Sequence, residues 1–251
     1  MSDSPAYWEE HWDQYSEATA LNPANAFRRR TIFHLLGLSG LSVDSTVLDV
    51  GCGSGDFLAE ISNRFPDVSL AGIDQSETGL DVTAGKFPGA VLQKVDLEST
   101  NPDTADLHQW ASHAVCSEVL EHLNEPVVAL KNIASLMMPG GVLVVTVPGG
   151  PKSAFDLSIG HLRHYTPTLI RKDLEAAGFT VHMASGAGFP MFNLYRLVVL
   201  MRGKQLAADI VGKPSFAACA AMAVFRVLLR FTLPRFPWGW QIVALAHKEH
   251  T

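Results

Sequence analysis

The chain has few cysteines, no excess of positive charge and no apolar stretch that makes a convincing membrane span. Three cysteines provide no disulfide framework, which favours a reducing, cytoplasmic setting. The net charge of −6 argues against a nucleic-acid partner, because phosphate binding requires a dense basic face. The acidic opening of the chain lacks the apolar core of a secretory signal. Metal-ligand spacing is also missing, so the sequence predicts no metal site.

What the chain does have is a glycine-rich turn after a short apolar run. Gly51, Gly53 and Gly55 stand at alternate positions, so the backbone can turn sharply and direct N–H groups at a ligand. A dinucleotide-binding turn would place its third glycine at position 56, which is Asp56 here. With Asp49 ahead of it, the turn resembles motif I of the class I S-adenosylmethionine-dependent methyltransferases.

Two further acids follow apolar segments. Asp74 lies 23 residues after Gly51, a spacing at which an acid in α/β cofactor folds accepts hydrogen bonds from a ribose diol. A helix N-cap is the alternative for Asp74. The resemblance implies that Asp96 binds the adenine amino group and that Leu97 packs on the ring, and a surface turn is the alternative for Asp96.

The string Glu118–Leu123, E-V-L-E-H-L, is frequent in the same superfamily and is more specific than the glycines. The resemblance places Ser117 and Gln75 beside the cofactor and His122 near the mouth of its site. A solvated helical turn is the alternative for the charged residues of this string. The resemblance as a whole implies this set of cofactor contacts: Arg28, Arg29, Asp49, Gly51, Cys52, Gly53, Gly55, Asp74, Gln75, Asp96, Leu97, Ser117 and Glu118.

Strand and helix patterns alternate along the chain, which predicts a mostly parallel sheet covered on both sides. The resemblance implies an α/β Rossmann-like methyltransferase fold, a doubly wound sheet of seven strands with an antiparallel last strand. We expect a single domain over residues 1–251. Its parts are a helical cap (1–44), a cofactor-binding core (45–186 and 238–251) and a helical lid insertion (187–237). Predicted strands are 46–50, 69–73, 90–95, 113–117, 142–147, 179–184 and 240–246, and predicted helices are 55–65, 76–86, 124–137 and 167–177.

The cap contains four aromatic residues within positions 7–15 and an arginine triplet at 28–30. In many relatives an arginine from such a helix pairs with the methionine carboxylate. Helical spacing places Arg28 and Arg29 beside the predicted apolar stripe, whereas Arg30 points away. A solvated basic helix start is the alternative interpretation.

The insertion has two apolar stretches, Phe189–Met201 and Ser215–Leu233. The first is too short to span a bilayer, and Arg226 and Arg230 interrupt the second at about 2.5–3.5 kcal/mol each. We expect a lid over an apolar acceptor or packing on the core, with at most weak peripheral membrane contact.

Three histidines are candidate catalytic residues: His161 first, His164 second, and His122 near the mouth of the site. Histidine has a suitable pKa for a general base, which adds roughly 10²–10⁴-fold to a rate. The string G-H-L-R-H-Y-T-P around the first two resembles one found in relatives with different acceptors. A structural role, in capping the next helix or holding the loop, therefore stays open.

The motifs are similar to those of ubiquinone- and menaquinone-pathway and natural-product methyltransferases. This implies transfer of a methyl group from S-adenosylmethionine to a small or lipophilic acceptor, with O- or C-methylation favoured. The alternatives are a non-catalytic S-adenosylmethionine-binding regulatory protein and, less favoured, an NAD-dependent oxidoreductase. The acceptor and the oligomeric state stay open.

Overall fold

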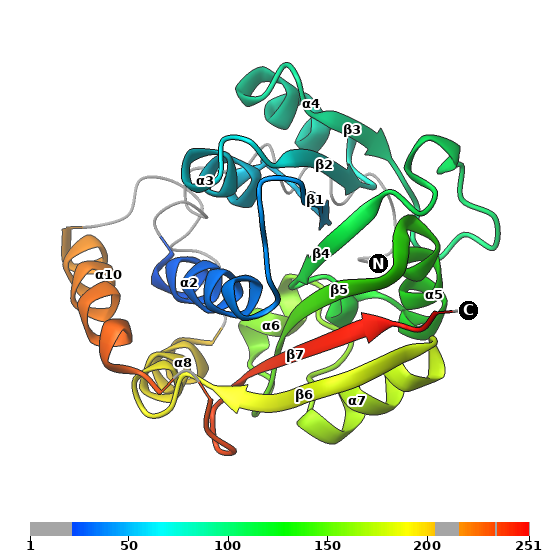
Figure 1. The fold of residues 1–251 in the computed structure, drawn as a ribbon. Coiled ribbons are helices and arrows are strands. Elements are labelled where there is room, and N and C mark those ends of the chain that lie inside the picture. The colour runs from blue at the N-terminus through cyan, green and yellow to red at the C-terminus, as the bar shows by residue number, and fades with distance from the viewer. Residues whose placement is uncertain (1–21, 204–215, 234, 251) are drawn as a thin grey trace.

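Seven strands form one central sheet in the computed structural model, which describes residues 22–203, 216–233 and 235–250 (Figure 1). The strand order is β3-β2-β1-β4-β5-β7-β6. The aromatic residues at 7–15 lie outside the described residues. The strands are β1 (Thr46–Val50), β2 (Ser69–Asp74), β3 (Val91–Lys94), β4 (Ala111–Ser117), β5 (Met137–Pro148), β6 (Phe179–Ala187) and β7 (Gln241–Lys248).

The first five strands are parallel, and β7 inserts antiparallel between β5 and β6. The predicted α/β sheet with an antiparallel last strand is therefore confirmed. Carboxyl ends of parallel strands meet at one edge of a sheet, and ligands bind beyond that edge. The antiparallel β7 begins at the same edge, because Gln241 pairs with Pro148.

Helices cover both faces of the sheet, since alternate strand residues are apolar and buried on both sides. One face packs against α2, α3 and α8, and the other against α5 and α7 (Figure 1). The helices are α2 (Pro23–Leu38), α3 (Asp56–Arg64), α4 (Glu77–Lys86), α5 (Pro126–Leu136), α6 (Ala154–Ser158), α7 (Pro167–Ala176), α8 (Met191–Arg202) and α10 (Phe216–Leu228), with 3₁₀ turns η1 (Ala105–Leu107), η2 (Leu120–His122) and η3 (Leu229–Phe231).

The structure differs most from the predicted elements at the start of the fifth strand. Strand β5 begins at Met137 rather than at 142, so the Pro-Gly pair lies inside an irregular start of the strand. The α10 helix ends at Leu228, and Arg230 lies in the 3₁₀ turn that follows. In the described part of the chain, no helix has the length and apolarity needed to cross a bilayer.

Candidate active site

The glycine-rich turn between β1 and α3 has a backbone that side chains rarely allow. Gly51, Gly53 and Gly55 have φ values of 71°, 49° and 72°, in the left-handed region that favours glycine. A Cβ atom at Gly51 would collide with Val119, and one at Gly55 would lie 2.7 Å from Thr83. The glycine-rich turn that the sequence predicts is therefore present in the structure.

Asp74 ends β2 and braces this turn. Its Oδ2 accepts a hydrogen bond from the Gly53 N–H (2.8 Å), and its Oδ1 accepts one from the Ser76 N–H (2.9 Å). Ser76, not Asp74, is the N-cap of α4, because its side chain accepts from the Gly79 N–H. The N-cap alternative for Asp74 is therefore wrong, and the carboxylate remains at the edge where β1 and β2 end.

A pocket opens at this edge, between the glycine turn and the ends of β2, β3 and β4. Its lining combines carboxylates with apolar side chains. Seven predicted site residues line it: Gly51, Asp74, Gln75, Asp96, Leu97, Glu118 and His122. The apolar lining that the sequence did not single out is Ile73, Val95, Val119 and Leu123.

The other predicted residues near the pocket do not line it with side chains. The Cys52 side chain packs toward Gly72, so this residue offers only its backbone to the turn. Ser117 shares a hydrogen bond with Thr146, with 2.8 Å between the hydroxyl oxygens. Asp49 is buried, and burial, followed by the nearby Asp74 and Asp56 charges, raises its pKa to about 8.

The two candidate arginines lie apart. Arg28 forms an ion pair with Glu118 (Nη2–Oε2, 2.8 Å) and donates from Nε to Gln241 at the start of β7. Arg29 pairs with Glu60 on α3 and takes no part in the pocket lining. Of the two, Arg28 therefore contacts the pocket edge.

Glu118 joins the cap, the sheet and the pocket. Its φ of 58° is uncommon for a residue with a side chain. The strained backbone is held by a hydrogen bond from the Glu118 N–H to the Thr146 carbonyl (2.9 Å) and by the Gln241 amide, which donates to Oε1 (2.8 Å). Backbone strain that the surrounding contacts hold in place is typical of functional sites.

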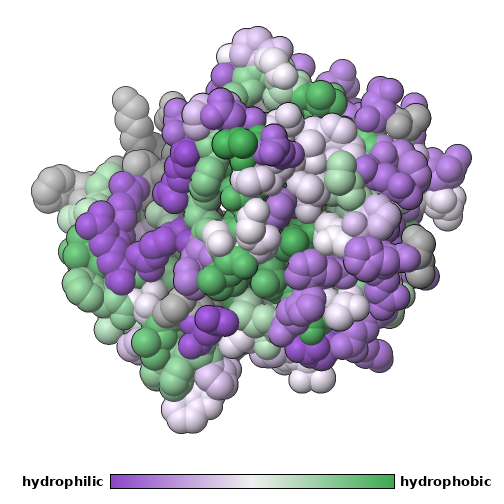
Figure 2. Space-filling model, viewed as in Figure 1, coloured by the Kyte–Doolittle hydropathy of each residue, from purple (hydrophilic) through white to green (hydrophobic). Residues whose placement is uncertain are grey.

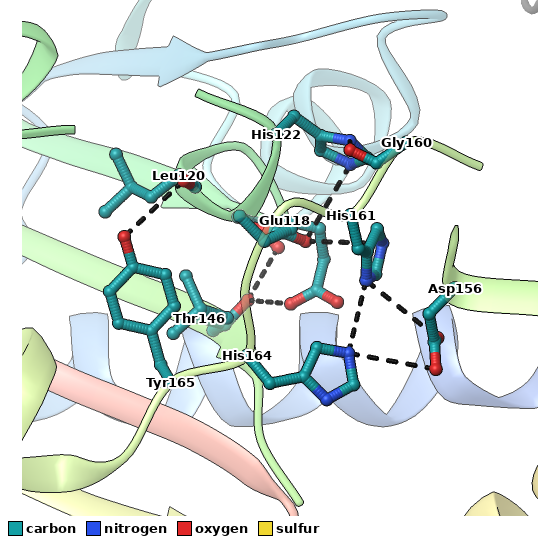
Figure 3. A network of polar contacts seen from close by, with 12 residues as sticks. Glu118, Leu120, His122, Thr146, Asp156, Gly160, His161, His164 and Tyr165 are labelled. Atoms are coloured by element: carbon teal, nitrogen blue, oxygen red, sulfur yellow. Dashed lines mark hydrogen bonds and ion pairs between the residues drawn. The ribbon is translucent and has the colours of Figure 1, made fainter. Parts of the chain in front are cut away.

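Beside the pocket, the rings of His161 and His164 contact each other (Figure 3). The Nδ1 atom of His164 lies 2.9 Å from the Gly150 carbonyl, which can only accept, so Nδ1 carries the proton. In a neutral His164 ring, Nε2 then accepts from Nδ1 of His161 (3.4 Å). The Nε2 lone pair of His161 is left facing Glu121, 3.9 Å from Oε1.

His122 presents its second nitrogen to the same carboxylate. Its Nδ1 donates to the Gly160 carbonyl (3.3 Å), and its Nε2 lies 4.0 Å from Glu121 Oε1. Its ring meets the edge of His161 at a centroid distance of 4.8 Å. Two imidazole lone pairs and one carboxylate therefore converge at the point where His122 also lines the pocket.

Glu121 is fully buried, and neither of its carboxylate oxygens has a hydrogen-bond partner within the described residues. Burial, followed by the neighbouring Glu118 charge, holds the pKa of Glu121 well above its ordinary value. Burial, followed by the His122 charge, lowers the pKa of His161 to about 2, so this ring is neutral at physiological pH. Neutral imidazole is the form that offers a lone pair.

These three residues can hold a divalent cation. Their ligand atoms lie within 4.8 Å of one another, and a buried carboxylate without hydrogen bonds is a fitting donor. The Gly160 carbonyl accepts a hydrogen bond from Nδ1–H of His122, and the His164 imidazole accepts one from Nδ1–H of His161. These bonds orient the two rings, as around known metal sites. Spacing had indicated no metal motif because the ligands come from two separated loops. We refer to Glu121, His122 and His161 as the Glu-His cluster.

A second group, Asp156, His161 and His164, is chemically different. Asp156 accepts two hydrogen bonds from Arg196 of α8, at 3.0 and 2.7 Å, and two more from the N–H and the hydroxyl of Ser153, the N-cap of α6. Burial would raise the pKa of Asp156, but the Arg196 hydrogen bonds and charge outweigh it and lower the pKa to about 2. The negative charge of Asp156 is therefore already balanced by the positive charge of Arg196.

The loop around the histidines also has the structural role left open above. Thr166 caps α7, and the Tyr165 hydroxyl donates to the Leu120 carbonyl (3.4 Å) in the buried core. Asp156 and Arg196 were not predicted as site residues. The Ser153–Asp156 spacing is a capping box visible in the sequence, but no local pattern points to Arg196.

A family model described as a methyltransferase domain matches residues 24–184. Among curated proteins, the ubiquinone biosynthesis O-methyltransferase of Aeromonas salmonicida (strain A449) is 29% identical over 212 residues, covering 74% of this chain and 83% of that protein. The trans-aconitate 2-methyltransferase of Methylobacterium radiotolerans is 31% identical over 121 residues, covering 48% of this chain and 45% of that protein.

Solved structures share the fold at lower identity. A putative sarcosine dimethylglycine methyltransferase from Galdieria sulphuraria aligns with a TM-score of 0.61 and 13% identity, covering 90% of this chain and 87% of that one. The [4+2]-cyclase SpnF aligns with a TM-score of 0.58 and 18% identity, covering 89% and 82%. Proteins named for different reactions thus share this architecture, and the residues of the site must decide the acceptor.

Proposed function

The chain belongs to the methyltransferase-domain family, and we propose that it transfers the methyl group of S-adenosylmethionine to a hydroxyl oxygen of a small, lipophilic acceptor. Family membership makes it an S-adenosylmethionine-dependent methyltransferase rather than an NAD-dependent oxidoreductase. One observation supports the acceptor assignment: His122 lines the cofactor pocket and also belongs to the Glu-His cluster. The cluster therefore adjoins the cofactor pocket.

The pocket residues fit the cofactor. Gly51 lines the pocket without a side chain, and we assign its backbone to the methionine part. We assign Asp74 to the ribose diol, Asp96 to the adenine amino group and Leu97 to the adenine ring. Arg28, at the pocket edge, would meet the methionine carboxylate by exchanging its contact with Glu118.

When bound, the cofactor supplies an electrophilic methyl group on a sulfonium. The acceptor oxygen forms the new O–C bond as the S–C bond breaks, and S-adenosylhomocysteine leaves without the sulfonium charge. Alignment of the reacting atoms can contribute about 7–11 kcal/mol. Without a bound cation, the hydroxyl proton passes to Nε2 of His122, the member of the Glu-His cluster that lines the pocket.

The low pKa of His161 limits this ring as a base acting alone, because a general base works best with a pKa near the operating pH. A divalent cation held by the Glu-His cluster would polarise the acceptor hydroxyl and make its proton more acidic. Glu121 and the two Nε2 atoms would orient that oxygen toward the cofactor pocket.

An acceptor panel tests the proposal. The purified protein is incubated with methyl-labelled S-adenosylmethionine and phenols or catechols with and without alkyl chains, beside matched amines and carboxylic acids. We expect labelled methyl ethers, formed faster on the alkylated phenols. Exclusive methylation of carboxylates, as the name of the trans-aconitate relative suggests for that protein, would contradict the hydroxyl assignment. Cofactor binding with no transfer to any acceptor would favour the regulatory alternative.

A further inference from the structure

Charge is unevenly distributed along this acidic chain. The insertion, residues 187–237, contains seven Lys or Arg residues and one acid, whereas the rest of the chain contains 12 basic and 24 acidic residues. Arg202, Arg226, Arg230 and Arg235 are exposed in the structure. The insertion is therefore a basic region on a protein that otherwise repels anions.

The insertion also exposes large apolar side chains. Of the 15 large hydrophobic residues that are exposed in the described chain, seven belong to it and an eighth, Trp238, follows it directly. Met201 is 78% exposed, Phe231 72% and Trp238 70%. We call this set the insertion face: Leu194, Leu197, Met201, Val224, Val227, Phe231, Leu233 and Trp238.

The exposed residues follow helical spacing, so they form an outer stripe. On α8, Leu194, Leu197 and Met201 are exposed, while Phe192 and Val199 are buried. On the inner side, Tyr195 of α8 meets Phe225 of α10 edge to face, with ring centroids 5.4 Å apart. The two helices are thus packed together, and the apolar stripe is not used in that packing. Figure 2 shows apolar surface along α10 and around α8.

Trp238 is held in place at the border of this face. The Asn193 amide donates to the Trp238 carbonyl (2.7 Å), and Asn193 Oδ1 accepts from the Trp240 N–H (2.9 Å). Its ring contacts Phe236 edge to face at 5.6 Å. A fixed, exposed tryptophan three residues after the exposed Arg235 matches the chemistry of a membrane interface, where the indole lies at headgroup level.

We propose that the insertion face docks the protein on an anionic lipid bilayer. Apolar side chains of α8, α10 and η3 enter the headgroup boundary, and the four exposed arginines meet anionic lipid headgroups. A neutral apolar partner would gain nothing from the basic residues, and a soluble polyanion would gain nothing from the exposed Phe231 and Trp238. The combination on one face fits a lipid surface, a setting from which a lipophilic acceptor is available.

Co-sedimentation of the full-length protein with vesicles tests this. Vesicles of phosphatidylcholine alone are compared with vesicles containing about one third phosphatidylglycerol, at low and high salt, without cofactor. We expect pelleting with the anionic vesicles at low salt, at least tenfold less at high salt and at least tenfold less on phosphatidylcholine.

Two pairs of variants separate the contributions. Phe231→Ser and the double variant R230Q/R235Q should each weaken vesicle binding at least fivefold. Val43→Ser, at an exposed apolar site outside the insertion, and Lys131→Gln on α5 are the matched controls and should leave binding unchanged. Thermal melting checks that each variant is folded.

Absence of pelleting with anionic vesicles would overturn the proposal, as would equal losses for test and control variants. Light scattering that shows Phe231-dependent dimers without vesicle binding would assign the face to a second copy of the chain and would also overturn it. Heparin binding that needs the arginines but not Phe231, without vesicle binding, would do the same. Because no methyl donor is present, a negative result leaves the proposed transfer reaction untouched.

Discussion

The cofactor pocket and the Glu-His cluster adjoin each other at the same sheet edge but are stabilised over very different sequence distances. In the pocket, Asp74 braces Gly53 across 21 residues, and both belong to adjacent β–turn–α units. In the neighbourhood of the cluster, Asp156 is held by Arg196 of α8 across 40 residues. The glycine turn and Asp74 are therefore fixed within the parallel sheet, whereas the surroundings of the cluster depend on the insertion.

This difference predicts that mutations can impair the cofactor pocket and the Glu-His cluster separately. Glu121→Gln keeps the size of the side chain but replaces the carboxyl group that faces His122 and His161 with an amide. We expect turnover to fall about 10²-fold or more, with the affinity for S-adenosylmethionine unchanged. Single-turnover kinetics and calorimetry measure the two quantities. Glu125→Gln, at an exposed neighbouring acid, is the control, and a parallel loss of cofactor affinity would show that the pocket and the cluster are not separable.

Chelation sharpens the same comparison. If a divalent cation binds the Glu-His cluster, EDTA should lower activity about as much as Glu121→Gln does, and Mg²⁺ or Mn²⁺ should restore it. Mn²⁺ binding followed by electron paramagnetic resonance should be present in the parent protein and lost in Glu121→Gln. Activity that is indifferent to EDTA would restrict the cluster to proton transfer and positioning.

Arg196→Met, a change within the insertion, should impair the Glu-His cluster and its surroundings. It leaves the buried Asp156 carboxylate without its partner, a change that costs about 3–5 kcal/mol and lowers the melting temperature by on the order of 10 °C. Turnover should fall while cofactor affinity stays. Arg196→Lys should recover part of both, because the charge returns without the paired N–H groups. Arg235→Met, elsewhere in the insertion, is the control, and an unchanged turnover in Arg196→Met would separate α8 from the histidines.

Asp74→Ala tests the cofactor pocket. If Asp74 binds the ribose hydroxyls through charge-assisted hydrogen bonds of about 1.5–3 kcal/mol each, affinity for S-adenosylmethionine should fall at least tenfold. Turnover at saturating cofactor should change much less. Asp96→Asn, at the exposed side of the pocket, should have a smaller effect. Unchanged affinity by calorimetry would remove Asp74 from the cofactor site.

The smallest effect is expected from the pH dependence of Asp49. Its pKa of about 8 in the folded chain lies above its ordinary value of about 3.9, so the unfolded chain loses this proton first. The free energy of unfolding therefore decreases as pH rises from about 4 to 8. Asp49→Asn should raise the melting temperature of the cofactor-free protein by several degrees at pH 8 and by much less at pH 5. An equal gain at both pH values would contradict the raised pKa.

The sequence predicted the sheet and the pocket well because both follow from short-range patterns. The short apolar runs that form the strands are local patterns, and Gly51, Gly53 and Gly55 meet a local requirement of the backbone. The seven predicted residues found in the pocket lining come from the ends of neighbouring strands. Their assignment to atoms of the cofactor stays a prediction.

Other features were missed or only partly predicted. The predicted start of the fifth strand at residue 142 was wrong, because Pro139 and Gly140 suggested a turn, whereas β5 begins at Met137, which pairs with Ala111 of β4. Arg28 and Arg29 were indistinguishable from helical spacing alone. Only the folded chain shows that Arg28 meets Glu118 and that Arg29 meets Glu60.

The amino-acid sequence by itself determined the α/β architecture, the glycine turn and the acids that end the strands, since each depends on neighbours within one β–turn–α unit. Only the tertiary structure decided that Glu121 faces two imidazole lone pairs, that Arg196 neutralises Asp156, and that the insertion exposes its apolar stripe. These arrangements join segments that are far apart in the chain, and the sequence alone does not determine how close such segments lie in space. They exist because the sheet order and the packing of α8 bring the segments together.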